Sequence, residues 1–109
     1  MSQPVQHLVL FRLPEAPGPE VEEEMRRQIS TWPGAIPGLR RLRFGADTGG
    51  RAEGYQFCLL TEFEDAAALA AYLPHPLHAA FLRWAQDRPF EVLRFDYPLD
   101  GKTSLLEPG

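Results

Sequence analysis

The sequence predicts an α+β fold of the ferredoxin-like type, with the order β-α-β-β-α-β, a four-stranded antiparallel sheet and helices on one face. Three observations lead to this prediction. Segments whose apolar residues repeat with a period of two alternate with segments whose apolar residues repeat at helical spacing. Clusters of proline and glycine separate these segments. Several of the strand segments are apolar on both faces, which predicts that both faces of the sheet are covered.

The first half of the chain has the pattern β-α-β. A strand is expected over 5–13, and Pro14, Pro17 and Pro19 end its extended pattern. A helix is expected over 19–32, because proline suits the first helical position and an apolar stripe recurs at helical spacing. The stripe consists of Val21, Met25, Ile29 and Trp32. A second strand is expected over 39–45.

The second half of the chain supplies the other elements of the predicted fold. They are a hairpin loop over 47–54, a strand over 55–63, a helix over 66–73, a helix over 76–87 and a last strand over 90–97. Glu64 and Asp65 are expected to cap the first of these helices, and Pro74 ends it. The chain is expected to form a single domain, with its core at about residues 5–97. The tail over 98–109 is expected to be loosely ordered or to lie across a partner subunit.

Composition and charge argue against several classes of partner. The net charge of −4 disfavours nucleic-acid binding, and the basic residues Arg40, Arg41 and Arg43 are expected to be split between the two faces of an edge strand. No apolar run approaches the roughly 20 residues needed to cross a bilayer, and the N-terminus does not resemble a signal peptide. The one cysteine, Cys58, is expected to be buried and fits a reducing compartment. We therefore expect a cytoplasmic protein with no nucleic-acid or membrane partner.

The apolar residues on the second face of the strands predict a homodimer. Leu8 and Leu10 in the first strand, and Cys58 and Leu60 in the third, lie on the face that the helices leave bare. A bare apolar sheet face of this size is a surface for protein association, and closed twofold pairing is the commonest way to cover it. Two such sheets packed together form a dimeric α/β barrel.

Five short stretches together resemble a known family. They are His7-Leu8-Val9-Leu10-Phe11, Ile36-Pro37-Gly38-Leu39, Gly54-Tyr55-Gln56-Phe57, Phe63-Glu64-Asp65 and Tyr72-Leu73-Pro74-His75-Pro76-Leu77-His78. In this order and spacing they resemble the stress-responsive A/B barrel family, the dimeric α/β barrel group, over roughly residues 5–97. The last stretch is the most specific, because it is similar to the family's tyrosine followed by a His-Pro-x-His motif.

The resemblance implies the fold and the dimer but no single activity. A plant branch of the family contains polyketide cyclases, in which the motif tyrosine and the second motif histidine serve an aldol-type cyclisation. By position, these residues correspond to Tyr72 and His78, and the first-strand histidine that lines the pocket corresponds to His7. Arg26 and Arg27 stand in the middle of the first helix, where that branch places a pocket tyrosine.

The residues themselves leave two interpretations of this cluster open. In one, Tyr72 and His78 are catalytic, and His7 and His75 bind a small hydrophobic or carbonyl-containing ligand; a neutral histidine accepts a proton while the tyrosine polarises a carbonyl group. In the other, His7 is a hydrogen-bonded core residue, His75 caps a helix, and Tyr72 and His78 only pack.

Three functions are compatible with these interpretations. The first is an acid–base enzyme of the lyase or cyclase kind. The second is a non-catalytic structural or stress-associated dimer. A less favoured third is a cofactor-independent monooxygenase. No cofactor motif is present, and no metal site is predicted, because no acidic residue or cysteine accompanies His75 and His78 at ligand spacing.

Overall fold

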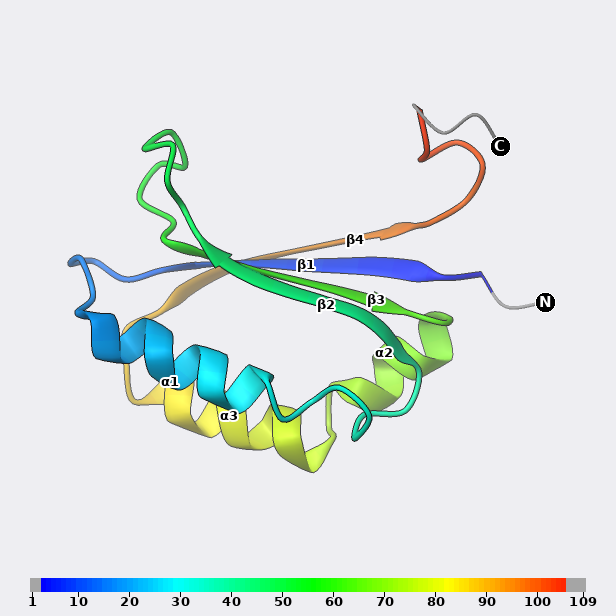
Figure 1. Cartoon of the computed structure of the whole chain (residues 1–109), viewed down its shortest axis with the longest axis horizontal. Coiled ribbons are helices and arrows are strands. Elements are labelled where there is room, and N and C mark those ends of the chain that lie inside the picture. The colour runs from blue at the N-terminus through cyan, green and yellow to red at the C-terminus, as the bar shows by residue number, and fades with distance from the viewer. Residues whose placement is uncertain (1–2, 106–109) are drawn as a thin grey trace.

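The computed structural model describes residues 3–105 and has the predicted ferredoxin-like architecture. Its elements are β1 (Val5–Arg12), α1 (Pro19–Ile29), β2 (Leu39–Ala46), β3 (Phe57–Phe63), α2 (Ala66–Tyr72), α3 (Pro76–Gln86) and β4 (Glu91–Pro98). The strands form one antiparallel sheet in the order β2-β3-β1-β4. All three helices lie on the same face of this sheet (Figure 1). Within residues 3–105, no helix is long and apolar enough to cross a membrane.

The core lies between the helices and the sheet and is rich in aromatic rings. The largest fully buried side chains include Trp32, Tyr72, Phe63 and Phe81. The Trp32 ring packs edge-on against the rings of Tyr72 and Phe81, at centroid distances of 5.6 and 5.7 Å. Such edge-to-face pairs add to the stabilisation from burial. The core is therefore built around the end of α2 and the start of α3.

Helix α1 ends at Ile29, three residues before the predicted end at Trp32. The hydroxyl groups of Ser30 and Thr31 donate hydrogen bonds to backbone carbonyls of the preceding turn, at 2.5 and 2.6 Å. Side chains of this kind compete with the helical hydrogen bonds. Pro33 also disfavours a helical conformation for the residue before it. Trp32 is nevertheless fully buried, because the turn after α1 directs it into the core.

Strand β2 is an edge strand, as predicted, but its arginines are not split between the two faces. The register of β2 against β3 shifts between Leu39 and Arg41. A bulge of this kind places two residues opposite one. Arg40 and Arg41 therefore both reach the carboxylate of Glu62, at 3.4 and 3.3 Å.

Strand β3 begins at Phe57, two residues later than predicted. The preceding loop contains Glu53 and Gly54 with positive φ angles of 52° and 88°, which interrupt the extended backbone. In a strand that began at Tyr55, as predicted, alternation would place Tyr55 on the core face together with Phe57. Instead, the guanidinium group of Arg12 lies over its ring, 4.7 Å from the centroid. The alternation of faces therefore starts only after this loop.

The sheet face away from the helices is apolar and uncovered in the single chain. Cys58, which was expected to be buried, is half-buried on this face. Strand β4 adds Leu93 and Phe95, which are 52% and 63% exposed. Their register against Leu10 and Leu8 of β1 places them on the same face. We call this surface, made of Leu8, Leu10, Cys58, Leu60, Leu93 and Phe95, the open face.

The first part of the predicted tail is attached to the sheet. The backbone N–H of Leu99 donates to the carbonyl of Pro4 at 2.9 Å, which extends the pairing of β1 with β4 by one bond. Asp100 and Thr103 then form a turn, with the Thr103 N–H donating to the Asp100 carbonyl at 3.2 Å. The remainder of the predicted tail, residues 106–109, lies outside the described residues.

Candidate functional site

The break between α2 and α3 brings Tyr72 and His78 together. Tyr72 is the last residue of α2, and His78 is the third residue of α3. Pro74 and Pro76 flank His75 between these helices, and the two prolines prevent one continuous helix. The spacing of a single straight helix therefore does not constrain the side chains of Tyr72 and His78, and their ring centroids lie 4.2 Å apart.

The hydrogen bond that His78 makes determines which of its ring nitrogens carries the proton. Its Nδ1 lies 2.8 Å from the backbone carbonyl oxygen of Leu73. A carbonyl oxygen can only accept, so the Nδ1–H donates and the neutral ring keeps its lone pair on Nε2. Burial lowers the pKa of His78 below its ordinary value of 6.5, against the opposing effect of this hydrogen bond. A neutral, oriented imidazole with an available Nε2 has the properties of a general base at physiological pH.

His75 holds the break in place from outside the cavity. It is the N-cap residue of α3, and its Nδ1 accepts a hydrogen bond from the N–H of Leu77 at 3.1 Å. In a continuous helix that N–H would pair with the carbonyl of Leu73. The cap therefore leaves the Leu73 carbonyl available to His78.

Tyr72 remains a hydrogen-bond donor over the physiological pH range. Its side chain is 1% exposed, and burial raises the pKa of its hydroxyl above the ordinary value of 10. Its ring also packs against Phe63 and Trp32, at centroid distances of 4.8 and 5.6 Å. The hydroxyl is therefore fixed in position and able to donate to a ligand.

His7 reaches the same place from the central strand β1. It is 4% exposed, and its ring lies 6.1 Å from that of Tyr72. Its Nδ1 lies 2.5 Å from Oδ1 of Asp96, the residue opposite it on β4. Because a carboxylate accepts, Nδ1 donates here, and Nε2 is the nitrogen left for another partner.

These three residues line one cavity of about 180 Å³ between α3 and the strands β1 and β4. Most of its wall is apolar; the lining residues are His7, Val9, Phe11, Leu59, Tyr72, Leu73, His78, Phe81, Leu82, Ala85, Phe90, Val92 and Arg94. An apolar cavity with a few convergent polar groups is typical of small-molecule sites. The structure thus brings together Tyr72, His78 and His7, whereas His75 is not among the lining residues.

Two polar residues of this region, Arg94 and Asp96, were not predicted from the sequence. Both lie on the face of β4 that is directed towards the helices, opposite Val9 and His7. The sequence did contain a signal for them, because every second residue of the predicted strand over 90–97 lies on one face. That face changes from apolar to charged along the strand, in the order Phe90, Val92, Arg94 and Asp96. Arg26 and Arg27, by contrast, pair with Glu22 and Glu24 on the exposed side of α1, away from the cavity.

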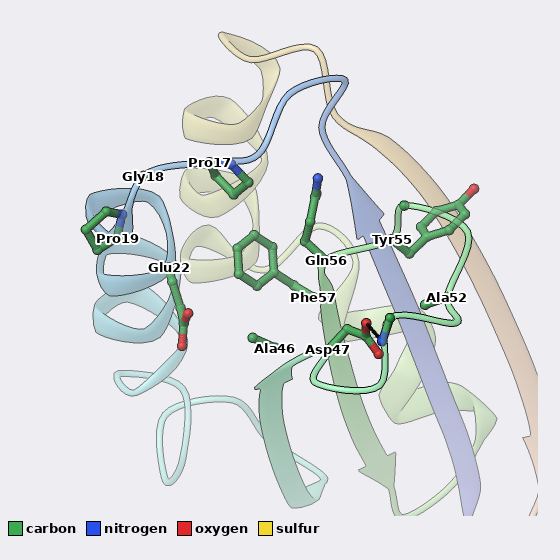
Figure 2. Close-up of a pocket in the computed structure, with 12 residues that line it drawn as sticks. Pro17, Gly18, Pro19, Glu22, Ala46, Asp47, Ala52, Tyr55, Gln56 and Phe57 are labelled. Atoms are coloured by element: carbon green, nitrogen blue, oxygen red, sulfur yellow. Dashed lines mark hydrogen bonds between the residues drawn. The ribbon is translucent and has the colours of Figure 1, made fainter.

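A second hollow, of about 430 Å³, is larger but wide open (Figure 2). It lies between the start of α1 and the loop that joins β2 to β3. Two of its polar side chains, Asp47 and Gln56, already have partners in the protein. The Asp47 carboxylate accepts from the backbone N–H groups of Gly49 and Gly50, and the Gln56 amide makes two hydrogen bonds with the backbone of Leu13. We therefore regard the smaller, more enclosed cavity as the candidate site. No group of three potential metal ligands occurs among the described residues.

The family model for the stress responsive A/B barrel domain matches residues 5–99, and the chain belongs to this family. This confirms the resemblance seen in the sequence. The stress-response A/B barrel domain-containing protein HS1 of Arabidopsis thaliana is 27% identical over 96 residues, which cover 86% of this chain and 88% of that protein.

Solved structures confirm the fold. A dimeric ferredoxin-like protein of unknown function from Thermobifida fusca is 28% identical, with a TM-score of 0.79, over 90% of this chain and 92% of that one. A hydroxynitrile lyase from Passiflora edulis has a TM-score of 0.77 at 15% identity, over 93% of this chain and 97% of that one. The second likeness is evidence for the fold alone.

Proposed function

We propose that this protein is a dimeric acid–base enzyme that removes a proton next to the carbonyl group of a small molecule. The observation that carries the proposal is the pairing of Tyr72 and His78 at the wall of one apolar cavity, 4.2 Å apart between ring centroids. One side chain is suited to accept a proton, and the other is suited to donate a hydrogen bond. Proton abstraction next to a carbonyl needs both functions at once.

In the proposed step, Nε2 of His78 takes the proton from the carbon next to the carbonyl. The C–H electron pair forms the new C=C bond, and the C=O π electrons move to the oxygen to give an enolate. The Tyr72 hydroxyl donates a hydrogen bond to that oxygen and stabilises the charge that develops there. The enolate carbon then attacks a second carbonyl carbon in an aldol-type cyclisation, the π electrons of that carbonyl move to its oxygen, and the protonated His78 returns its proton to the resulting alkoxide. The reverse sequence cleaves a carbon–carbon bond.

We assign supporting roles to the other two histidines. His7 forms part of the cavity wall, where its Nε2 is available to orient a polar group of the ligand. For His75 we propose an indirect role, since its cap leaves the Leu73 carbonyl available to orient His78. Removal of either residue should therefore reduce the rate less than removal of His78.

Deuterium exchange tests this proposal without knowledge of the natural substrate. The protein is incubated with 2-butanone or 2-oxobutyrate in D₂O, and NMR measures the loss of the signal from protons next to the carbonyl. We expect His78→Ala to reduce the protein-catalysed rate by about 10²–10⁴-fold. Tyr72→Phe should also reduce it strongly, because the ring remains and only the donor is lost.

The controls separate catalysis from packing. His78→Gln keeps a polar side chain in the cavity wall and should be as inactive as His78→Ala, with a smaller effect on thermal stability. The residues would only pack if the wild type exchanged the substrate protons no faster than buffer does. The same conclusion would follow if the variants unfolded at lower temperature but catalysed the exchange as fast per folded molecule. The non-catalytic dimer would then be the better interpretation.

We propose the homodimer on the basis of the open face and of relatives described as dimeric. Fully burying a large apolar side chain contributes about 1.5–3 kcal/mol, so a few such residues from each subunit can offset the cost of association. Sedimentation equilibrium at micromolar concentration should give twice the chain mass of 12.3 kDa. A stable, folded monomer there would refute the dimer. We also propose a cytoplasmic location, which the single cysteine fits.

A further inference from the structure

Among the described residues that line the cavity, Arg94 is the one side chain with a permanent charge. The other polar side chains among them are Tyr72, His78 and His7, and none of them is a carboxylate. Arg94 lies on the edge strand β4, opposite Val9, on the face directed towards the helices. Its own side chain is exposed, which places its charge where the cavity meets solvent.

The guanidinium group of Arg94 has no carboxylate partner among residues 3–105. Five other arginines each have one within 4.0 Å: Arg12, Arg26, Arg27, Arg40 and Arg41. The arginines that also lack one in the described part of the chain do not line the cavity; they are Arg43, Arg51, Arg83 and Arg88. The nearest acid on the same strand face is Asp96, whose Oδ1 is taken by His7. A planar guanidinium group without a partner is suited to bind a carboxylate through two parallel hydrogen bonds.

The size of the cavity limits what such an anion can be. The cavity has a volume of about 180 Å³. This is below the range of about 300–1,000 Å³ that is typical for drug-sized ligands. A compact molecule fits this space, and a long polyketide chain does not.

We propose that Arg94 recognises an anion and that the cavity takes a short carbonyl compound bearing a carboxylate, such as a small 2-oxo acid. The carboxylate binds Arg94 at the mouth, while the carbonyl group lies against Tyr72 and His78 inside. This inference rests on the proposed function in that both place the ligand in the same cavity. It adds the charge and the size of the ligand.

Isothermal titration calorimetry with three probes tests the assignment. The probes are 2-oxobutyrate, the neutral ketone 2-butanone, and inorganic phosphate as an anion without a carbonyl group. We expect 2-oxobutyrate to bind the wild type at least tenfold more tightly than either of the other two. Arg94→Gln should weaken the binding of 2-oxobutyrate by about ten- to a hundredfold, the range for the loss of a hydrogen bond to a charged group. The same substitution should leave the affinity for 2-butanone unchanged.

Two further variants control for charge and for geometry. Arg83→Gln removes an exposed arginine of α3 that does not line the cavity, and it should change no affinity. Arg94→Lys keeps the charge but loses the planar fork, so its affinity for 2-oxobutyrate should lie between those of the wild type and Arg94→Gln. Thermal denaturation confirms that each variant is folded.

The outcomes distinguish this inference from the proposed function. The assignment of Arg94 would be overturned if Arg94→Gln left the affinity for 2-oxobutyrate unchanged, or if Arg83→Gln lowered that affinity equally. The ligand class would be overturned if 2-oxobutyrate did not bind the wild type at millimolar concentration. In that case the proposed function would still stand if the protein exchanged the protons of 2-butanone in a way that depends on Tyr72 and His78. Binding that depends on Arg94 without any proton exchange would support the ligand class and refute the enzyme.

Discussion

The two faces of the sheet come from the same strands yet have opposite characters. On the face covered by the helices, the packed rings of Trp32 and Tyr72 are at most 1% exposed. On the open face, Leu8 and Leu10 are only half-buried, and Phe95 is 63% exposed. The covered face is completed by the chain's own helices, whereas the open face carries large apolar side chains but lacks a cover. The polar groups to which we assign a chemical role lie where the chain itself excludes water, whereas the open face is suited to association.

The largest effect should come from a charge placed on the open face. Phe95→Asp removes a side chain that, if fully buried in a dimer, contributes about 1.5–3 kcal/mol. Twofold symmetry makes the loss occur twice. We therefore expect dimerisation to weaken roughly 10²–10⁴-fold, as measured by sedimentation velocity over a range of concentrations.

A matched substitution of an exposed leucine that is not part of the open face serves as the control for Phe95. Leu105 is 90% exposed in the segment after β4, so Leu105→Asp should leave the dimer mass unchanged. Unchanged dimerisation of Phe95→Asp would show that the open face is not the interface. The contrast between the two faces would then have to be explained by another partner.

A somewhat smaller effect is expected from a substitution that creates a void in the core beneath the helices. Trp32 is fully buried, and replacement of such a residue by alanine costs about 3–5 kcal/mol. Trp84 is only half-buried at the edge of the same core, so Trp84→Ala should cost clearly less. Urea denaturation at fixed protein concentration measures both. Equal losses would mean that the core is not centred on the junction of α2 and α3.

The smallest effect should be the pH dependence that His78 contributes. Its pKa in the folded protein is lowered by burial, so below pH 6.5 the unfolded chain binds more protons than the folded protein. The free energy of unfolding therefore falls as the pH drops below 6.5 and continues to fall towards the lowered pKa. This part of the pH dependence should be absent from His78→Gln, as measured by urea denaturation between pH 7.5 and 5.5. Identical losses in both proteins would indicate that His78 is not desolvated.

Much of the candidate site could be predicted from the sequence because its residues belong to one local motif. Tyr72, His75 and His78 lie within seven residues, and the two prolines around His75 predict the break that lets Tyr72 and His78 converge. His7 was identified as a histidine on an otherwise apolar strand face. Arg94 and Asp96 were not identified, because their importance depends on which strand pairs with β1 and in which register.

The sequence by itself determined the order of the elements, the two-sided apolarity of the strands and the break between α2 and α3. These features depend on local periodicity and on backbone chemistry, which act within a few residues. Only the tertiary structure decided that Arg94 and Asp96 stand beside β1, that His75 turns away from the cavity while His78 enters it, and that Arg40 joins Arg41 at Glu62. Each of these depends on strand register or on the direction of a single side chain. A shift of one residue in register reverses the face on which a side chain lies, and short-range patterns do not specify that shift.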